Sequence, residues 1–234
     1  MNQEKIRKFW EERGRKKAVN GSFSLTNLET DSALEHKKVL AERKKVDSFL
    51  DIDGSDRILD LGCGTGSWSF YFAGRAGFIV GVDYCEPMIE KAKAQARKDG
   101  FENISFKQSE VCEYRANTTF TIVFISGLIL YLDDQSLSKL LKNVRGCTGP
   151  KARLFLREPA GIPERYEIRN KWSPALGANY SATYRTRSEL IKTVENYDFK
   201  LKRDSDMFAK GSELNKYENT RLRIYEFNKI NYIE

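Results

Sequence analysis

The feature that most limits the fold of this chain is the stretch RILDLGCGTGSW at residues 57–68, where an apolar run leads into alternating glycines. Ile58, Leu59 and Leu61 form a short run typical of a strand buried on both faces. Glycine lacks a Cβ, so the loop can adopt positive φ and let a ligand approach the backbone closely. From Ser67 onward the sequence indicates a helix start, whose free N–H groups favour a polar or anionic ligand group. We therefore expect a loop that lies against a small molecule, the alternative being a tight turn that needs glycine for its own geometry.

A second apolar strand, FIVGV at residues 78–82, ends in Asp83. An acidic residue at this place in such a unit can bind two ribose hydroxyls. This spacing alone admits a dinucleotide-binding protein, whose fingerprint is G-x-G-x-x-G. The third glycine of that fingerprint would fall on Ser67, and the glycines instead alternate as G-x-G-x-G. The pattern therefore argues against NAD as the ligand.

The segment LDLGCGTG at residues 59–66 resembles the first motif of the class I S-adenosylmethionine-dependent methyltransferases at every position. The segment GVDYCEPMIEKAKAQ, which begins at Gly81, resembles their second motif, and the resemblance extends over roughly residues 38–228. It implies an α/β, Rossmann-like fold: a seven-stranded, mostly parallel sheet of order 3-2-1-4-5-7-6 with helices on both faces. It also implies S-adenosyl-L-methionine as the cofactor and S-adenosyl-L-homocysteine as the product.

A chain of 234 residues with 40% hydrophobic residues can bury one full domain. No apolar run reaches the ~18 residues needed to span a bilayer, and the N-terminus lacks the apolar region of a signal peptide. We therefore expect a cytoplasmic protein that does not bind a membrane. Its expected units are a helical lid at residues 1–31 and a cofactor-binding methyltransferase domain at 32–234, with a substrate-lid insertion at about 159–185.

The pattern of elements predicts the same architecture. Strands and helices alternate through residue 158, which favours a parallel sheet, and a closing antiparallel pair follows. Ligands of such sheets lie beyond the carboxyl ends of the strands, at the switch point. We expect helices at 3–13, 32–50, 134–145 and 186–197, and later strands at 103–107, 119–126, 149–159, 199–206 and 221–228.

The cysteine pattern and the net charge limit the classes of ligand and partner that the chain is expected to bind. The four cysteines form no C-x-x-C pair and there is one histidine, so the sequence predicts no metal site. The net charge of +7 admits nucleic acid, acidic small substrates or a surface without a partner. The run EHKKVLAERKK alternates in sign at helical spacing, which is typical of a solvated helix face. Because no basic tail or RNA-binding signature is present, we expect a small-molecule substrate rather than nucleic acid, and the oligomeric state stays open.

The resemblance also assigns a cofactor site. Asp60 would hold the glycine loop or reach the cofactor's ammonium group, and Asp83 would accept hydrogen bonds from both ribose hydroxyls. Tyr84 would pack on the adenine, or simply at the strand end. Glu110 would accept from the adenine amine, although the family more often has Asp there. The predicted cofactor-binding residues are Asp60, Gly62, Cys63, Gly64, Gly66, Asp83, Tyr84, Glu110, Val111 and Ser126.

Methyl transfer requires a nucleophile in line with the S–CH3 bond and the exclusion of water. Many methyltransferases with this fold carry a histidine after the fourth strand, but SGLILYLDD at residues 126–134 has none. Tyr131 is the nearest polar candidate to position the acceptor, with packing on the next helix as the alternative. Arg157 and Glu158, at the tip of the fifth strand, are the other candidate catalytic residues. An acceptor that is already anionic would need no strong base and would be oriented by cations.

The family builds its acceptor pocket from the N-terminal segment and from the insertion after the fifth strand. Both are basic and aromatic in this chain, which suits a polar, anionic small molecule under a lid. Any single arginine there can equally be a solvated charge. The predicted substrate-binding residues are Trp10, Arg13, Arg169, Lys171 and Tyr184.

These observations predict methyl transfer, by in-line attack on the sulfonium methyl, to an oxygen of phosphate, carboxylate or sugar type in a small acceptor. RNA or a protein is the alternative acceptor, although the N-P-P-Y and Pro-Cys motifs of several such enzymes are absent. A third interpretation is a non-catalytic nucleotide binder or an NAD-dependent oxidoreductase. The sequence does not identify the acceptor, decide between oxygen and nitrogen, or name a general base.

Overall fold

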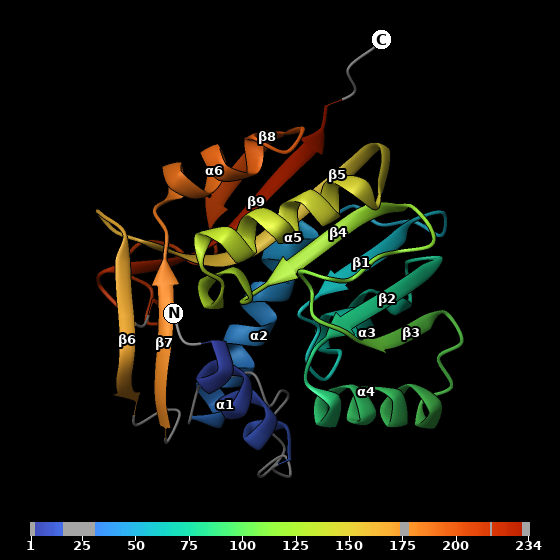
Figure 1. Ribbon diagram of the computed structural model, residues 1–234, viewed down its shortest axis with the longest axis horizontal. Helices are drawn as coiled ribbons and strands as arrows, with labels where there is room; N and C mark the ends of the chain where they lie inside the picture. Colours follow the sequence, from blue (N-terminus) through green and yellow to red (C-terminus); the bar gives the residue numbers. More distant parts are fainter. Residues whose placement is uncertain (1–2, 16–30, 174–177, 216, 231–234) are drawn as a thin grey trace.

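The computed structural model describes residues 3–15, 31–173, 178–215 and 217–230 of the chain (Figure 1). Most strands join one seven-stranded sheet, which forms the centre of the molecule. Across this sheet the strands are β3 (Ile104–Gln108), β2 (Phe78–Asp83), β1 (Arg57–Leu61), β4 (Phe120–Ser126), β5 (Thr148–Gly161), β9 (Thr220–Lys229) and β8 (Phe199–Asp206).

Strands β1 to β5 run parallel, and β9 is antiparallel to both β5 and β8. Counted in chain order within this sheet, the arrangement is 3-2-1-4-5-7-6, so the predicted topology is confirmed. β2 and β4 pair on opposite sides of β1. The adjacent ends of β1 and β4 therefore form the switch point where ligands of such sheets lie.

Helices cover both faces of the sheet, as predicted. The central strands are apolar throughout because neighbouring side chains point to opposite faces and both faces are covered. Ile58 and Phe124 pack with Phe72 of α3, whereas Leu59 and Val123 share a cluster with α5 and α6. The helices are α1 (Gln3–Arg15), α2 (Ser32–Asp47), α3 (Ser67–Ala73), α4 (Glu86–Lys98), α5 (Asp134–Gly146) and α6 (Arg187–Glu195), with a short 3-10 helix η1 (Ile129–Tyr131).

After β5 the chain forms a separate antiparallel hairpin of β6 (Tyr166–Ser173) and β7 (Ala178–Tyr184). This hairpin is the insertion that the sequence analysis places at about 159–185, but its strands are not predicted there. β5 itself continues to Gly161, beyond the expected end at 159, because β9 pairs with it as far as Thr220. In Figure 1 the hairpin lies apart from α4, with α1 between them.

Helix α1 bridges the hairpin and the body of the domain, since it contacts both β7 and α4. Its buried Ile6 and the Cys85 thiol, which donates to the Trp10 carbonyl at 3.5 Å, fix it against the start of α4. Asp31 caps α2 by accepting from the backbone of residues 33 and 34. The rest of the predicted lid, residues 1–2 and 16–30, lies outside the described residues. None of the helices in the described ranges has the length and apolar character needed to cross a bilayer.

Candidate active site

A cavity of about 390 Å³ lies at the carboxyl ends of the parallel strands, next to the switch point. Its size is in the range of small-molecule sites. The ends of β1, β2, β4 and β5 line one side, and α1, α2, β7 and the segment before β9 line the others. Every predicted cofactor residue except Gly66 lines this cavity. The sequence motif and the topology therefore identify the same place.

Gly66 is required by the backbone conformation and packing of the loop. It adopts φ +83°, and a Cβ there would lie 2.6 Å from Cζ of Phe106. The residue must therefore be glycine both for its left-handed conformation and for packing against β3. Gly66, predicted to bind the cofactor, is not among the residues that line the cavity.

Asp83 stands at the end of β2 with both oxygens anchored. Its Oδ2 accepts from the Gly64 amide at 2.9 Å and its Oδ1 from the Cys85 amide at 2.9 Å. These bonds fix the carboxylate in the cavity wall, and each oxygen keeps a lone pair for another donor. Burial raises the pKa of Asp83, whereas the backbone donors act in the opposite direction. The geometry suits a group that receives two neighbouring hydroxyls.

Asp60 is buried at the end of β1, and its Oδ2 accepts from the Ser69 hydroxyl on α3 at 2.7 Å. It thus ties the strand to the helix that follows the glycine loop. Burial raises the pKa of Asp60 to about 7, with the neighbouring Asp83 adding to the effect and Ser69 opposing it. Of its two predicted roles, holding the loop is the one with a contact in the structure.

Glu110 and Tyr84 lie where α1 covers the cavity. The Arg7 guanidinium pairs with the Glu110 carboxylate and sits 5.2 Å from the centre of the Tyr84 ring. The Tyr84 hydroxyl donates to the Ile6 carbonyl at 3.5 Å. Both predicted adenine contacts are therefore also contacts of the N-terminal helix, which the sequence analysis does not anticipate.

Tyr131 lines the cavity from η1, and its ring packs edge-on against Trp10 at 5.5 Å between centroids. Burial raises the pKa of the Tyr131 phenol well above its usual value, so it is neutral at physiological pH. A neutral phenol can donate a hydrogen bond but is no general base. Partial burial lowers the pKa of Arg13, which is near Tyr131 but does not line the cavity.

Arg157 and Glu158 point in different directions from the end of β5. Arg157 lines the cavity, donating to Glu42 at 2.6 Å and to the Ser126 hydroxyl at 3.1 Å. The Oε1 atom of Glu158 instead accepts from the backbone amides of Leu128 at 2.7 Å and residue 129 at 3.0 Å. Glu158, predicted as a catalytic residue, is not among the residues that line the cavity, because neighbouring residues of a strand face opposite sides.

The hairpin contributes tyrosines rather than cations. Tyr180 and Tyr184 of β7 line the cavity, and Tyr184 is one of the predicted substrate-binding residues. Arg169 is 84% exposed and pairs with Glu167 at 2.7 Å, and Lys171 is also exposed. The structure thus does not bring the two predicted cations, Arg169 and Lys171, into the site. Composition alone cannot tell which side of an insertion faces inward, and long charged side chains favour water.

Some lining residues escape the sequence analysis. Lys38 and Arg43 of α2 reach the cavity. The charge pattern of the run EHKKVLAERKK, which contains both residues, instead predicts a solvated helix face. Tyr217, from the segment before β9, reaches it from the far end of the chain. The spacing of Val39 and Arg43, one helical turn apart, is consistent with one inward face. Nothing local in the sequence marks Tyr217.

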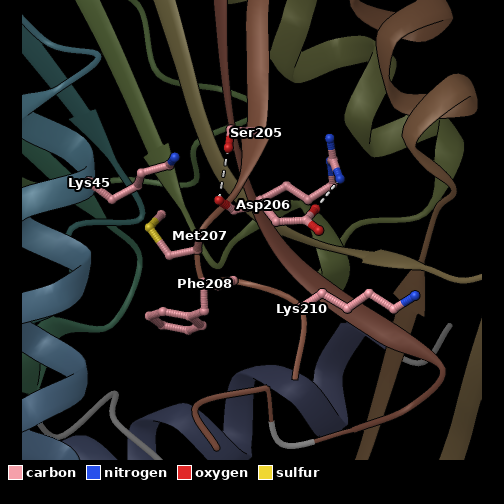
Figure 2. Close-up of a pocket in the computed structure, with 8 residues that line it drawn as sticks. Lys45, Ser205, Asp206, Met207, Phe208 and Lys210 are labelled. Atoms are coloured by element: carbon pink, nitrogen blue, oxygen red, sulfur yellow. Dashed lines mark hydrogen bonds and ion pairs between the residues drawn. The ribbon is translucent and has the colours of Figure 1, made fainter. Parts of the chain in front are cut away.

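A second hollow, of about 460 Å³, opens between α2 and the segment after β8 (Figure 2). Lys45, Asp206, Lys210 and Arg223 are among its lining residues, and Arg223 pairs with Asp206. It shares only Phe208 with the strand-end cavity and includes none of the predicted site residues. The strand-end cavity, which is the more enclosed of the two, is therefore the candidate active site.

Comparison with known proteins agrees with this geometry. Residues 58–151 match a family described as "Methyltransferase domain". The chain is 27% identical over 153 residues to phosphoethanolamine N-methyltransferase 1 of Triticum aestivum, a match that covers 64% of this chain and 29% of the relative. It is 38% identical over 86 residues to 23S rRNA (uracil(1939)-C(5))-methyltransferase RlmD of Haemophilus ducreyi, covering 37% of this chain and 19% of that protein. The chain thus spans less than a third of the length of either curated relative.

Solved structures share the fold over nearly the whole chain. A Haemonchus contortus phosphoethanolamine N-methyltransferase 1, in complex with phosphoethanolamine and S-adenosylhomocysteine, has a TM-score of 0.76 at 19% identity, covering 99% of this chain and 49% of that chain. A complex of DhpI with SAH has a TM-score of 0.67 at 14% identity, covering 97% and 96%. The predicted resemblance to the class I S-adenosylmethionine-dependent methyltransferases is thereby confirmed in the fold, and the methyltransferase-domain match at residues 58–151 includes the glycine motif.

Proposed function

We propose that this chain binds S-adenosylmethionine and transfers its methyl group to an oxygen of a small anionic acceptor. The observation that carries the proposal is one cavity in which the motif residues and several basic and phenolic side chains meet. Asp60, Asp83 and the glycine loop line it together with Lys38 and Arg157. A cavity of about 390 Å³ is in the range of small-molecule sites, and its basic side chains suit a negatively charged ligand.

The cofactor fits the residues at the strand ends. When bound, it supplies a sulfonium methyl group that is already a strong electrophile. Asp83, fixed by two backbone amides, would accept from the ribose hydroxyls. Glu110 and Val111 would face the adenine, and the Gly64 backbone would lie along the methionine part. The protein thereby supplies orientation and exclusion of water rather than covalent chemistry.

The rest of the cavity fits an anion. Lys38 and Arg43 reach it from α2 and Arg157, which is paired with Glu42, from β5, while Tyr180 and Tyr217 bring hydroxyl groups from the hairpin and the segment before β9. Cations bind phosphate and carboxylate oxygens by charge-assisted hydrogen bonds. An oxygen that is already anionic has no proton to lose, which accords with the absence of a histidine from residues 126–134.

The neutral Tyr131 and helix α1 would help to position the acceptor for methyl transfer. Its phenol would donate a hydrogen bond to the acceptor, and Trp10 packs against its ring. Helix α1, held by Arg7 on Glu110, would act as the lid expected for residues 1–31. The β6–β7 hairpin would form the second lid, with Tyr184 facing the acceptor. Closure of both elements excludes water from the reacting atoms.

A phosphorylated amine methylated on nitrogen is a second candidate acceptor. It is favoured by the structural neighbour that holds phosphoethanolamine and by the wheat N-methyltransferase relative. Both candidates share an anionic group, so the basic end of the cavity would serve either. RNA is less well supported, because the rRNA methyltransferase match covers only 37% of the chain.

The proposal is tested by incubating the protein with methyl-labelled S-adenosylmethionine and separate phosphate, phosphonate and carboxylate compounds, phosphoethanolamine among them. Mass spectrometry of the products then distinguishes a methyl ester from a methylamine. Formation of an ester supports oxygen transfer, and a methylamine selects the second candidate. Transfer to RNA or protein fractions, with none to the anionic compounds, would refute the small-molecule assignment.

A further inference from the structure

The segment after β4 depends on one buried carboxylate. The Oε1 atom of Glu158 accepts from two successive amides, those of Leu128 at 2.7 Å and Ile129 at 3.0 Å. Glu158 is only 2% exposed, and within the described residues its Oε2 atom has no hydrogen-bond partner. Burying a carboxylate is costly unless it is well paired. An apolar residue would stabilise the core at lower cost, so the carboxylate has a more specific task than filling space.

The backbone that Glu158 holds carries part of the cavity wall. Leu128 and Tyr131 both line the cavity. Leu128 also abuts the glycine loop, since a Cβ on Gly62 would lie 3.1 Å from the Leu128 Cβ. A small shift of residues 128–129 would therefore move both the support of the glycine loop and the phenol at the acceptor end.

A second buried side chain holds the same segment from its carbonyl side. Arg185, 4% exposed at the end of the hairpin, donates to the Ile129 carbonyl at 3.2 Å and to the Leu132 carbonyl at 2.8 Å. Its guanidinium also pairs with Asp134 at 2.6 Å. The segment is thus held from two sides. Glu158 accepts hydrogen bonds from its N–H groups, and Arg185 donates hydrogen bonds to its C=O groups.

We propose that Glu158 is a positioning residue for methyl transfer. It acts without touching either ligand, by fixing the backbone at Leu128 and Ile129 and so the places of Leu128 and Tyr131 in the cavity. The segment requires an oxygen at the end of a side chain of this length, which can accept from both amides, rather than a negative charge. This inference rests on the proposed function.

Three substitutions of Glu158 separate reach from charge, with S-adenosylhomocysteine affinity by calorimetry as the readout. Glu158→Gln keeps an oxygen at the same reach and should bind within a factor of about three of the wild type. Glu158→Asp keeps the charge but is one methylene shorter, and Glu158→Leu removes the acceptor; both should bind about tenfold to a hundredfold more weakly. The same affinity for Gln and Asp, or weaker binding by Gln than by Asp, would overturn the proposal.

A matched control separates positioning from loss of stability. Glu226 is a carboxylate of similar burial, 1% exposed, which pairs with Lys202 and Arg203 outside the cavity. Glu226→Leu should lower the melting temperature while leaving S-adenosylhomocysteine affinity unchanged. If it weakens binding as much as Glu158→Leu does, the effect of Glu158 is only structural. A wild-type protein that does not bind S-adenosylhomocysteine would refute the proposed function itself, and is thus distinguishable from failure of this inference.

Discussion

At the scale of single residues, the site depends on buried or half-buried carboxylates that each make a specific contact. Asp60 accepts from a helix hydroxyl, Asp83 from two loop amides, and Glu158 from two amides after β4. Each is taken out of water, which disfavours the charged form and raises the pKa. The hydrogen bonds therefore position these groups, and burial brings the titration of Asp60 and Glu158 to about pH 7.

Asp83→Ala should weaken binding of S-adenosylhomocysteine by about tenfold to a hundredfold, because the ribose would lose its acceptor and the Gly64 amide its partner. Calorimetric titration of the variant and the wild type measures this change. Asp99→Ala, at an exposed position after α4, is the control and should bind like the wild type. Equal affinity for Asp83→Ala and the wild type would remove Asp83 from the site.

Ionisation of Asp60 should make the protein less stable as the pH rises. Burial raises the folded-state pKa of Asp60 from 3.8 to about 7, with Asp83 as the charged group facing it. The folded state thus holds the proton more tightly, so the stabilising contribution is complete below pH 3.8 and is lost as the pH rises through about 7. From pH 4 to 8 the wild type should lose up to about 4 kcal/mol relative to Asp60→Asn, as urea unfolding would measure. A constant difference between the two proteins across this range would contradict this.

At the scale of elements, the sequence predicts best where hydrophobic pattern and pairing agree. The strands of the main sheet and helix α5 lie close to their predicted ranges. The apolar pattern also suggested that the helix beginning at residue 32 continues to 50. It ends at Asp47, and Phe49 and Leu50 instead pack into the core after the helix end. The strands β6 and β7 were not predicted, because they form by pairing with each other within a polar insertion.

The contact between α2 and β5 predicts a coupled pair of substitutions. Arg157 and Glu42 are both largely buried and lie 2.6 Å apart, so Arg157→Ala leaves an uncompensated carboxylate inside the protein. We expect that variant to lose about 3 kcal/mol of unfolding free energy. Adding Glu42→Ala should recover more than half of the loss, as measured by urea unfolding in a double-mutant cycle. Additive losses would mean that the two charges do not stabilise each other.

The pair of Arg157 and Glu42 also gives a prediction about acceptor use. Because Arg157 lines the cavity, the double variant Glu42→Ala with Arg157→Ala should regain stability but not the use of an anionic acceptor. Its affinity for S-adenosylhomocysteine should stay within about threefold of the wild type. A large loss of that affinity would instead place Arg157 at the cofactor.

At the scale of the whole molecule, the two ends of the cavity differ in how far they can be predicted. The proposed cofactor end is built from short motifs at strand ends, so the sequence alone could predict that Asp60, Gly64 and Asp83 lie together in the cavity wall. The proposed acceptor end brings together α1, α2, the hairpin and the segment before β9. Its residues are distant in the chain, so Lys38 and Tyr217 could be placed only by the fold.

The central claim is that the strand-end cavity holds the adenosyl cofactor, and titration of the wild-type protein with S-adenosylhomocysteine, with NAD in parallel, tests it most directly. We expect micromolar binding of S-adenosylhomocysteine and no heat from NAD, because Ser67 replaces the third glycine of the dinucleotide fingerprint. Binding of NAD alone, or of neither compound, would contradict the account of the glycine loop and of every residue placed around it.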